Sequence, residues 1–423
     1  MKKVKKDTID INRLPKKPTW YLRPIIVVGA FFATLFSKIK VNKVNCENLK
    51  WPYILICSHA SFLDFIMNAK MTFPHHTSYI CSIEEFVGRE WLMRGIGAFP
   101  KRKYTKDIRV VKNCLHVLKK QKNTLSIYAE ARYSPSGTNE RIDGAMGKLA
   151  KTAKVPVVMM ITHGNFLHQP QWDQKHPRNL KYEIDFKCIA TQEEVETLSA
   201  EEIQQRIVDN FVYDDYKWQY ENKIKVKSKY RANNIHNLLY KCPHCGKDYA
   251  MDSKHTHLWC KECGAKYEMD VYGRLHCLTG EGKFEHVPDW YRWEREEVRK
   301  EVESGTYRFE DTVRIEKLSV SSKGFIPLGH VKFVQDIDGI HLHGTLDNGE
   351  EFHFDNDPIN TPSIHIDYNF KKRGVLKRGQ TLDIDTLNDT WYIYPQTENR
   401  VVTKIHLATE ALYDRAEREL KNN

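Results

Sequence analysis

The chain has 423 residues, a formal net charge of +11 and 29% charged residues. This length predicts two or three domains, and the positive charge favours an anionic partner, either a phospholipid surface or a nucleic acid. Nucleic acid is the weaker choice, because the chain carries no recognised nucleic-acid-binding module. Six of the ten cysteines are scattered without a pairing pattern, which is typical of a protein from a reducing compartment.

Residues 1–40 combine a basic run with an apolar stretch, and they predict a membrane-associating segment. The first 17 residues hold seven Lys or Arg against two Asp. The apolar residues 24–36 are fewer than the roughly 20 that span a bilayer, and they lack the small-residue cleavage site of a signal peptide. With Trp20 and Tyr21 before it, the stretch is typical of a peripheral or monotopic anchor on the cytoplasmic face of the cell membrane. The alternative is a helix buried in the protein core.

Residues 41–195 alternate β-rich runs with helix-period stretches, which predicts an α/β domain with a mixed sheet and flanking helices. The expected strands lie near 53–57, 77–83, 124–129, 155–162 and 180–188, and the expected helices near 62–73, 84–94, 106–121 and 144–153. Gly144 and Gly147 precede the fourth strand and allow close packing or a backbone turn there.

His59 and Asp64 are the first candidate site in this domain. Residues five apart on a helix point about 140° away from each other. The two side chains therefore meet only if His59 lies on the turn after the first strand and Asp64 in the first turn of the next helix. The sequence favours that layout, because the β-rich run ends at Cys57 and Ser61 can cap a following helix. A capping box of Ser61 and Asp64, with no catalytic role for the carboxylate, is the alternative.

Three further blocks follow in order, namely 97–102, 128–134 and 155–158. Together with His59-x4-Asp64, they resemble the four ordered motifs of the glycerolipid acyltransferase family, whose best-known members acylate lysophosphatidic acid. The resemblance covers about residues 20–190. The first block matches the family in its spacing, the second in its glycine and terminal arginine, and the fourth in Val-Pro-Val-Val.

The third block departs from the family, which usually reads Glu-Gly-Thr-Arg-Ser. Here Glu130 and Ser134 align, but Tyr133 stands in the place of the arginine, and Arg132 comes one position early. In the family this arginine is thought to help hold the phosphate of the acceptor, so the shift leaves the identity of the acceptor open. The resemblance implies that Arg102, Glu130 and Arg132 organise the acceptor.

The chemistry of acyl transfer suits the first block. A base takes the proton of an alcohol while its oxygen attacks a thioester carbonyl, and histidine is suited to this at neutral pH. A carboxylate orients the imidazole and stabilises the imidazolium, which assigns these roles to His59 and Asp64. No enzyme nucleophile is needed, because the acceptor itself attacks. The resemblance implies a donor acyl group carried on coenzyme A or acyl carrier protein.

Residues 196–240 are expected to form a helical linker, which a capping box at Ser199 and Glu202 opens. Residues 241–285 predict a zinc ribbon, because two Cys-x2-Cys pairs are separated by 14 residues. Four thiolates fill a tetrahedral site, which favours structural zinc over catalytic zinc. A pair of disulfides and an iron site of the rubredoxin type are the alternatives. The four ligands are Cys242, Cys245, Cys260 and Cys263.

Residues 286–423 predict a charged helix, a small antiparallel β unit and a final helix from about residue 404 to 420. This order is compatible with a PH-like barrel or a sandwich. His341 and His343 share one face of a strand and are expected to be solvated or to contact a neighbouring strand rather than to bind a metal. The basic residues 371–378 are expected to form a solvated loop.

Taken together, these features predict a membrane-associated O-acyltransferase of phospholipid biosynthesis. It would transfer a fatty acyl group from a thioester to the hydroxyl of a glycerolipid, with lysophosphatidic acid as the first candidate. One alternative is an acyltransferase with a different lysolipid or lipid alcohol as acceptor. Another is a non-catalytic, membrane-bound binding or regulatory protein that works through its ribbon and β unit.

Overall fold

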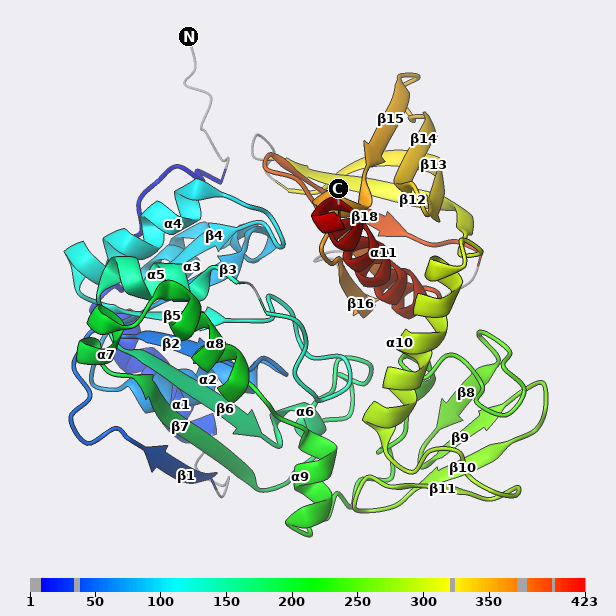
Figure 1. Cartoon of the computed structure of the whole chain (residues 1–423), viewed down its shortest axis with the longest axis horizontal. Coiled ribbons are helices and arrows are strands. Elements are labelled where there is room, and N and C mark those ends of the chain that lie inside the picture. Colours follow the sequence, from blue (N-terminus) through cyan, green and yellow to red (C-terminus); the bar gives the residue numbers. More distant parts are fainter. Residues whose placement is uncertain are drawn as a thin grey trace. The chain divides into compact units, whose positions relative to one another are not determined.

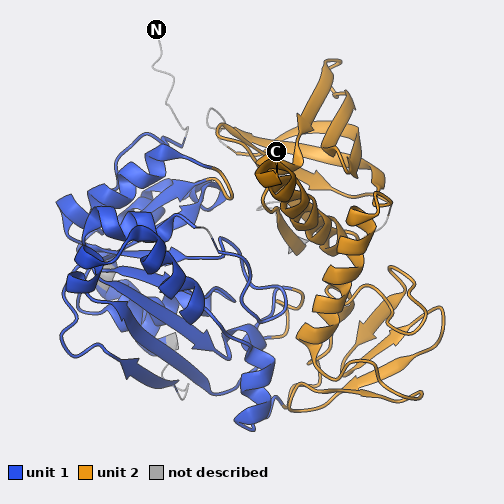
Figure 2. Cartoon of the chain, viewed as in Figure 1, with its two compact units in different colours: residues 1–101, 106–171, 177–226 blue, residues 102–105, 172–176, 227–423 orange. Residues whose placement is uncertain are grey.

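The computed structural model describes residues 9–33, 39–142, 144–319, 324–370, 379–397 and 400–422. The chain forms two compact units (Figure 2). Unit 1 contains residues 1–101, 106–171 and 177–226, and unit 2 contains residues 102–105, 172–176 and 227–423. The basic run before residue 9 and the basic loop 371–378 lie outside the described residues.

Unit 1 is built on the mixed sheet that the sequence predicts. Seven strands follow the order β1-β7-β6-β2-β5-β3-β4, in which neighbouring strands are parallel except for the antiparallel pair β6 and β7. The strands are β1 (Ile39–Val44), β2 (Ile54–Cys57), β3 (Thr77–Ser82), β4 (Ala98–Lys101), β5 (Thr124–Tyr128), β6 (Val157–His163) and β7 (Tyr182–Ala190).

Helices lie on both faces of this sheet, with α1 and α2 on one and α4, α5 and α8 on the other (Figure 1). The helices that the pattern predicts are all present, although the stretches 84–94 and 106–121 are each divided in two. The elements are α1 (Leu22–Ala33), α2 (Leu63–Thr72), η1 (Ile83–Phe86), α3 (Glu90–Gly95), α4 (Ile108–Leu115), η2 (His116–Gln121), α5 (Met146–Ala153), α6 (Asn165–His168), α7 (Gln192–Thr197), α8 (Ala200–Asn210) and α9 (Asp215–Glu221).

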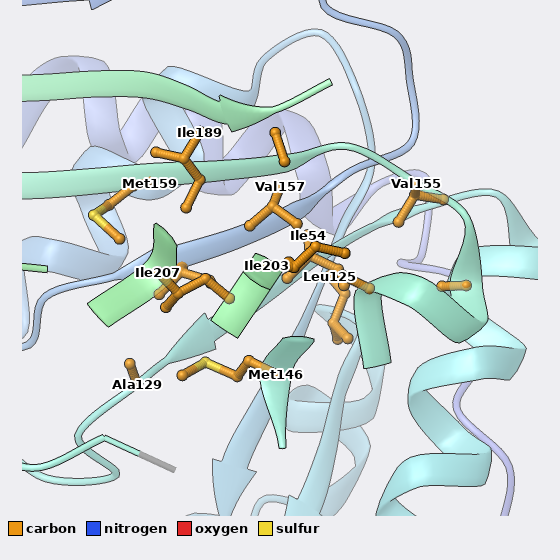
Figure 3. Close-up of a cluster of buried hydrophobic side chains, with 14 of the residues drawn as sticks. Ile54, Leu125, Ala129, Met146, Val155, Val157, Met159, Ile189, Ile203 and Ile207 are labelled. Carbon is orange, nitrogen blue, oxygen red and sulfur yellow. The ribbon is translucent and has the colours of Figure 1, made fainter. Parts of the chain in front are cut away.

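A hydrophobic core fills the space between the sheet and the helices α4, α5 and α8 (Figure 3). Ile54, Leu125 and Val157 enter it from three adjacent strands, while Ile203 and Ile207 enter it from α8. Burying each such side chain contributes about 1.5–3 kcal/mol. Helix α8 therefore belongs to the core of unit 1, although it lies in the segment that the sequence pattern describes as a linker.

Gly147 allows α5 and α8 to approach each other closely, as the sequence suggests. A Cβ atom at this position would lie 2.2 Å from the carbonyl oxygen of Ala200 and 2.8 Å from the backbone nitrogen of Gln204. Both atoms belong to the backbone and cannot move aside cheaply. The Gly147 N–H also donates to the side chain of Gln204 at 2.9 Å. A larger residue would push the two helices apart and open the core beneath them.

Helix α1 presents apolar side chains to solvent. Ile25, Val28, Phe31 and Phe32 are all exposed, and the preceding Trp20 is 80% exposed. These side chains therefore do not fit the alternative that this stretch is a helix buried in the protein core. Within the described part of the chain, no helix combines the length and the apolar character that crossing a membrane requires.

Unit 2 begins with turns and a small sheet. In the predicted linker, helical residues beyond α9 are limited to the short turn η3 (Ile235–Asn237), and residues 222–234 form no regular helix. The small sheet is antiparallel with the order β11-β10-β9-β8. Its strands are β8 (Met251–Lys254), β9 (His257–Cys260), β10 (Lys266–Met269) and β11 (Leu275–Cys277).

The C-terminal part of unit 2 joins two helices to a second sheet of seven strands. All neighbours in the order β15-β14-β13-β12-β18-β17-β16 are antiparallel. β12 and β18, the first and last of these strands in chain order, pair with each other, which joins all seven strands into one continuous sheet. The elements are α10 (Val287–Glu303), β12 (Phe309–Ser319), β13 (Ile326–Asp336), β14 (Gly339–Thr345), β15 (Glu351–Asn356), η4 (Pro358–Asn360), β16 (His365–Phe370), β17 (Gly379–Asp385), β18 (Asp389–Tyr394) and α11 (Val402–Asn422).

Candidate active site and metal centre

His59 and Asp64 meet at the carboxyl end of β2, in the centre of the sheet of unit 1. Strand β2 ends at Cys57, His59 lies on the following turn, and Asp64 lies in the first turn of α2. His59 Nδ1 is 3.2 Å from Asp64 Oδ2. The turn-then-helix layout thus brings together two residues that a continuous helix would hold apart.

The carboxylate of Asp64 is fully buried and saturated with hydrogen-bond donors. Its Oδ2 atom accepts from the backbone N–H groups of Ala60 (2.5 Å) and Ser61 (2.9 Å) as well as facing His59. Its Oδ1 atom accepts from Thr162 Oγ1 (2.9 Å) and Asn165 Nδ2 (2.5 Å). Burial alone would raise the pKa of Asp64, but the hydrogen bond and charge of His59, with the other donors, lower it below its ordinary value. Asp64 is therefore a carboxylate at neutral pH.

These contacts support both roles that the sequence leaves open for Asp64, namely capping the start of α2 and orienting His59. Asp64 accepts the N–H of Ser61, as the acidic residue of a capping box does. In a capping box the serine hydroxyl would accept from the N–H of Asp64 in return. Here the Ser61 hydroxyl accepts instead from the N–H of Leu63 (3.3 Å). The same carboxylate oxygen faces His59. One aspartate thus shapes the turn that carries the histidine and also orients the imidazole ring.

Two tyrosines hold the imidazole ring of His59. The ring of Tyr128 is stacked on it, with centroids 4.1 Å apart, and the ring of Tyr133 is tilted against it at 4.3 Å. The side chain of His59 keeps 21% of its surface exposed. With Nδ1 directed at Asp64, Nε2 is the nitrogen that can accept a proton from a bound alcohol, which is the arrangement of an oriented general base.

The third block is bonded directly to the turn that carries His59. The backbone N–H of Ser134 donates to the carbonyl of His59 at 2.7 Å, and the N–H of His59 lies 3.3 Å from Glu130 Oε2. Both carboxylate oxygens of Glu130 accept from the hydroxyl of Tyr213 at 2.9 Å, and Oε1 accepts from the backbone N–H of Glu140. Burial raises the pKa of Glu130 to about 8. In this structure Glu130 connects three loops.

The two candidate arginines already have protein partners. Arg132 is buried and forms an ion pair with Glu140 at 3.0 Å. Arg102 is counted in unit 2, where its guanidinium donates to the carbonyls of Leu318 (3.2 Å) and Asn388 (2.7 Å) and to the hydroxyl of Thr390. Arg102 is thus bonded within unit 2, whereas His59 belongs to unit 1. A role of these arginines in holding an acceptor stays a prediction.

Ala131 adopts a left-handed backbone conformation, with φ at +56°. It stands where the Glu-Gly-Thr-Arg-Ser pattern has its glycine. A side chain costs roughly 1–2 kcal/mol in this region of φ, whereas glycine has no Cβ atom to clash. Alanine at this position therefore costs backbone strain that glycine would not.

Sequence reasoning missed several residues that complete the site. Thr162 and Asn165 bond Asp64, and Tyr213 bonds Glu130. A signal existed only for the first two, because they follow the fourth block, at the carboxyl end of a strand adjacent to β2. Tyr213 lies more than 80 positions beyond Glu130, and no spacing rule relates the two.

A second histidine of unit 1, His163, lies next to Thr162 at the end of β6. Its Nε2 atom is 3.1 Å from Asp185 Oδ2, and its Nδ1 atom is 3.6 Å from Asp215 Oδ1. Burial opposes the charged form, but the hydrogen bond to Asp185 and the nearby carboxylate of Asp215 raise the pKa of His163 to about 9. Burial also raises the pKa of Asp215, which accepts the N–H of Gly164. The charged form of His163 is therefore favoured, because two carboxylates face one imidazole ring.

The four cysteines of the ribbon converge in unit 2. Cys242 Sγ lies 3.6 Å from Cys263 Sγ, and Cys245 Sγ lies 3.8 Å from Cys260 Sγ. All four sulfur atoms lie within 4.8 Å of one another. A tetrahedral zinc with Zn–S bonds of about 2.3 Å requires sulfur atoms about 3.8 Å apart, so these positions fit one metal ion. This cluster could hold a metal, as the spacing predicts.

Comparison with known proteins bears on residues that surround His59. The model of the family described as Acyltransferase matches residues 39–162. No curated protein sequence matches the chain. Among solved structures, the 1-acyl-sn-glycerophosphate (LPA) acyltransferase PlsC from Thermotoga maritima aligns over 45% of this chain and 79% of its own, at 18% identity and a TM-score of 0.33. SsgB of Streptomyces coelicolor aligns over 27% of this chain and 86% of its own, at 13% identity and a TM-score of 0.13.

The family model covers the candidate site. Its match begins with β1 and ends within β6, and it includes His59, Asp64 and Glu130. Residues 39–162 therefore form a domain of the acyltransferase family, which confirms at family level the resemblance seen in the ordered sequence motifs.

Proposed function

We propose that this chain is a membrane-associated O-acyltransferase that moves a fatty acyl group from a thioester to the hydroxyl of a glycerolipid. The observation that carries the proposal is the pairing of His59 with the buried Asp64 inside an acyltransferase-family domain. It also argues against a purely non-catalytic protein, because a binding module has no need for a histidine that is oriented by a buried, fully hydrogen-bonded carboxylate.

The reaction needs one proton to be moved twice. His59 takes the proton of the acceptor hydroxyl while the oxygen attacks the thioester carbonyl carbon. Asp64, charged at neutral pH, stabilises the imidazolium that forms. The tetrahedral intermediate then breaks its carbon–sulfur bond, the thiolate leaves, and His59 returns the proton to the sulfur. The donor is an acyl group carried on coenzyme A or on acyl carrier protein.

Lysophosphatidic acid is the first candidate acceptor. A lysolipid or lipid alcohol without a phosphate monoester is the second, and Tyr133 favours it. Where the family pattern has an arginine, this chain has a tyrosine whose ring contacts His59, and the neighbouring Arg132 forms an ion pair with Glu140. An aromatic ring beside the base offers an apolar contact rather than a charge for a phosphate.

The membrane part of the proposal rests on residues 20–33. Helix α1 exposes Ile25, Val28 and Phe32, and Trp20 before it is 80% exposed. Apolar side chains of this kind, next to a basic run, suit insertion into the headgroup region of an anionic leaflet. The substrates lie in the same surface, so this anchor would place the site beside them on the cytoplasmic face of the cell membrane.

For the four cysteines we propose one structural zinc ion. Cys242, Cys245, Cys260 and Cys263 supply the sulfur ligands, and four thiolates leave no position for water or substrate. A bound ion would hold the two turns of the ribbon together.

The proposal is tested with a labelled acyl thioester and a panel of lysolipids. The wild-type protein should acylate at least one of them, and His59→Ala should lower the rate by about 10²–10⁴. His75→Ala is a matched control, because His75 is an exposed histidine of the same unit that stacks on Trp51 and has no place in the site. Near-normal turnover by His59→Ala would reject the mechanism, and equal loss in His75→Ala would assign the effect to folding.

A further inference from the structure

Three histidines and one aspartate lie on one face of the β14–β15 hairpin in unit 2. His341 stands opposite Asp355 in the strand register, and His343 stands opposite His353. Residues two apart on a strand point to the same face, and directly paired residues have their Cβ atoms about 5 Å apart. The hairpin therefore gathers four potential metal ligands into one patch, separate from the four cysteines.

The side chains in this patch already converge on one point. His341 Nδ1 lies 2.6 Å from Asp355 Oδ1, and His343 Nε2 lies 2.8 Å from the same oxygen. The ligand atoms of these three residues all lie within 4.8 Å of one another. His353 stands beside this group, with its ring 5.0 Å from the ring of His343, centroid to centroid.

The charges around the patch favour a cation. A second carboxylate, Asp336, has its Oδ1 atom 3.8 Å from His341 Nε2. Asp336 also pairs with Arg308 at 2.6 Å, and Lys332 pairs with Glu310 at 2.6 Å. Together with Asp355, three carboxylates thus stand against two basic side chains in this group, which leaves a negative balance. Two imidazoles converging on one carboxylate oxygen either share it through two N–H bonds or bind, with it, a metal ion.

We propose that His341, His343 and Asp355, with His353 as the fourth ligand, bind one Zn²⁺ ion. Imidazole nitrogen selects zinc and its neighbours in the first transition row, whereas Mg²⁺ and Ca²⁺ prefer oxygen ligands throughout. Bonds of about 2.0–2.1 Å in a tetrahedral site place ligand atoms about 3.4 Å apart, so the present contacts must open by about 0.6–0.8 Å. The side chains of His343 and Asp355 are 43% and 54% exposed, which leaves them room to move.

Such an ion would fasten the end of the sheet. Strand β15 is the terminal strand of the described order, and on the side away from β14 it has no strand partner among the described residues. Terminal strands of this kind fray and can pair with other chains. A metal that joins β14 to β15 through side chains from both would reduce the opening of the hairpin without covering its surface.

The test counts zinc on the full chain with its cysteine site intact. After equilibrium dialysis against Zn²⁺ and elemental analysis, wild-type protein should hold about one zinc more per chain than His343→Gln or Asp355→Asn. Each variant should lose at least about tenfold in affinity for that additional ion. Glu351→Gln is the matched control, because it removes a carboxylate from the same face of β15 that contacts Thr345 and not the patch.

Hydrogen exchange gives an independent measurement. Added Zn²⁺ should slow exchange of the backbone amides of residues 351–356 in wild type and in Glu351→Gln, and leave His343→Gln unchanged. Equal zinc content in wild type and in both patch variants would overturn the proposal, as would protection of residues 351–356 that persists in His343→Gln.

Discussion

Replacing Asp64 with asparagine separates the two roles of this residue, because the change keeps the shape of the side chain and removes its charge. Asparagine retains one oxygen. If that oxygen takes the position of Oδ2, it still accepts from His59, Ala60 and Ser61, and the new amide N–H₂ faces the donors of Thr162 and Asn165.

The cost in stability should be modest, because one of those donors can turn. The Oδ1 atom of Asn165 has no hydrogen-bond partner, so a flip of its amide would let it accept from the new N–H₂ group. The loss of one charge-assisted contact at a buried site then costs about 1–3 kcal/mol. The loss of the negative charge beside His59 leaves the imidazolium without its counter-ion, and the rate should fall by about 10²–10⁴.

The measurement compares kcat/KM for acyl transfer with the free energy of unfolding of both proteins. Asp107→Asn is the control, because Asp107 caps α4 through the N–H of Arg109 and asparagine caps equally well. The folded pKa of Asp64 lies below its ordinary value. Its stabilising contribution is therefore present above the ordinary pKa and is lost as the pH falls through the folded one, so the gap in stability between wild type and Asp64→Asn should close in acid. A variant that loses stability but keeps its rate would show that Asp64 is only a cap.

Four further outcomes are expected. Deleting residues 1–40 should move the protein from the membrane fraction to the soluble fraction, and high salt should release the intact protein only in part; unchanged partitioning would place the anchor elsewhere. Cys260→Ser should abolish zinc binding by the ribbon and increase proteolysis there, whereas full protease resistance after chelation would count against a structural ion. Ala131→Gly should raise the free energy of unfolding by about 1 kcal/mol, because glycine relieves the positive φ; a destabilised variant would contradict that reading. His163 has a folded pKa of about 9, above the unfolded value, so its contribution of up to about 3 kcal/mol is complete below the unfolded pKa and disappears as the pH rises through 9. The stability deficit of His163→Gln, measured by denaturant unfolding, should shrink across that range, and a constant deficit would exclude the charge as its source.

The hydrophobic pattern predicts the centre of unit 1 well and its edges poorly. Strand β2 and residues 157–161 of β6 are continuous apolar runs, because strands in the middle of a sheet that helices cover on both sides are buried on both faces. The strands β1 and β4 were not predicted, and they lie at the two ends of the sheet. β1 carries the polar residues Lys40, Asn42 and Lys43 and is mostly exposed, and β4 contains Pro100, which only an edge strand tolerates.

The same distinction applies to the site. Local spacing was enough to predict that His59 and Asp64 meet on a turn and a helix start, and that two Cys-x2-Cys pairs converge. The tyrosines against His59 and the bond from Tyr213 to Glu130 come from strand order and from a segment far along the chain. Contacts of that kind depend on the tertiary fold, and the spacing of residues along the sequence does not predict them.

The hydroxyl of Tyr213 has a consequence for how chains of this kind are compared. The family model ends at residue 162, yet Asn165 bonds Asp64 and Tyr213 bonds Glu130 from beyond that limit. An alignment confined to the matched region would show every motif intact in a chain that had lost both contacts. Such a chain would keep the signature of an acyltransferase while the groups that hold its base and its third block were gone. For this architecture, intact motifs within the matched region are therefore not a sufficient sign of activity.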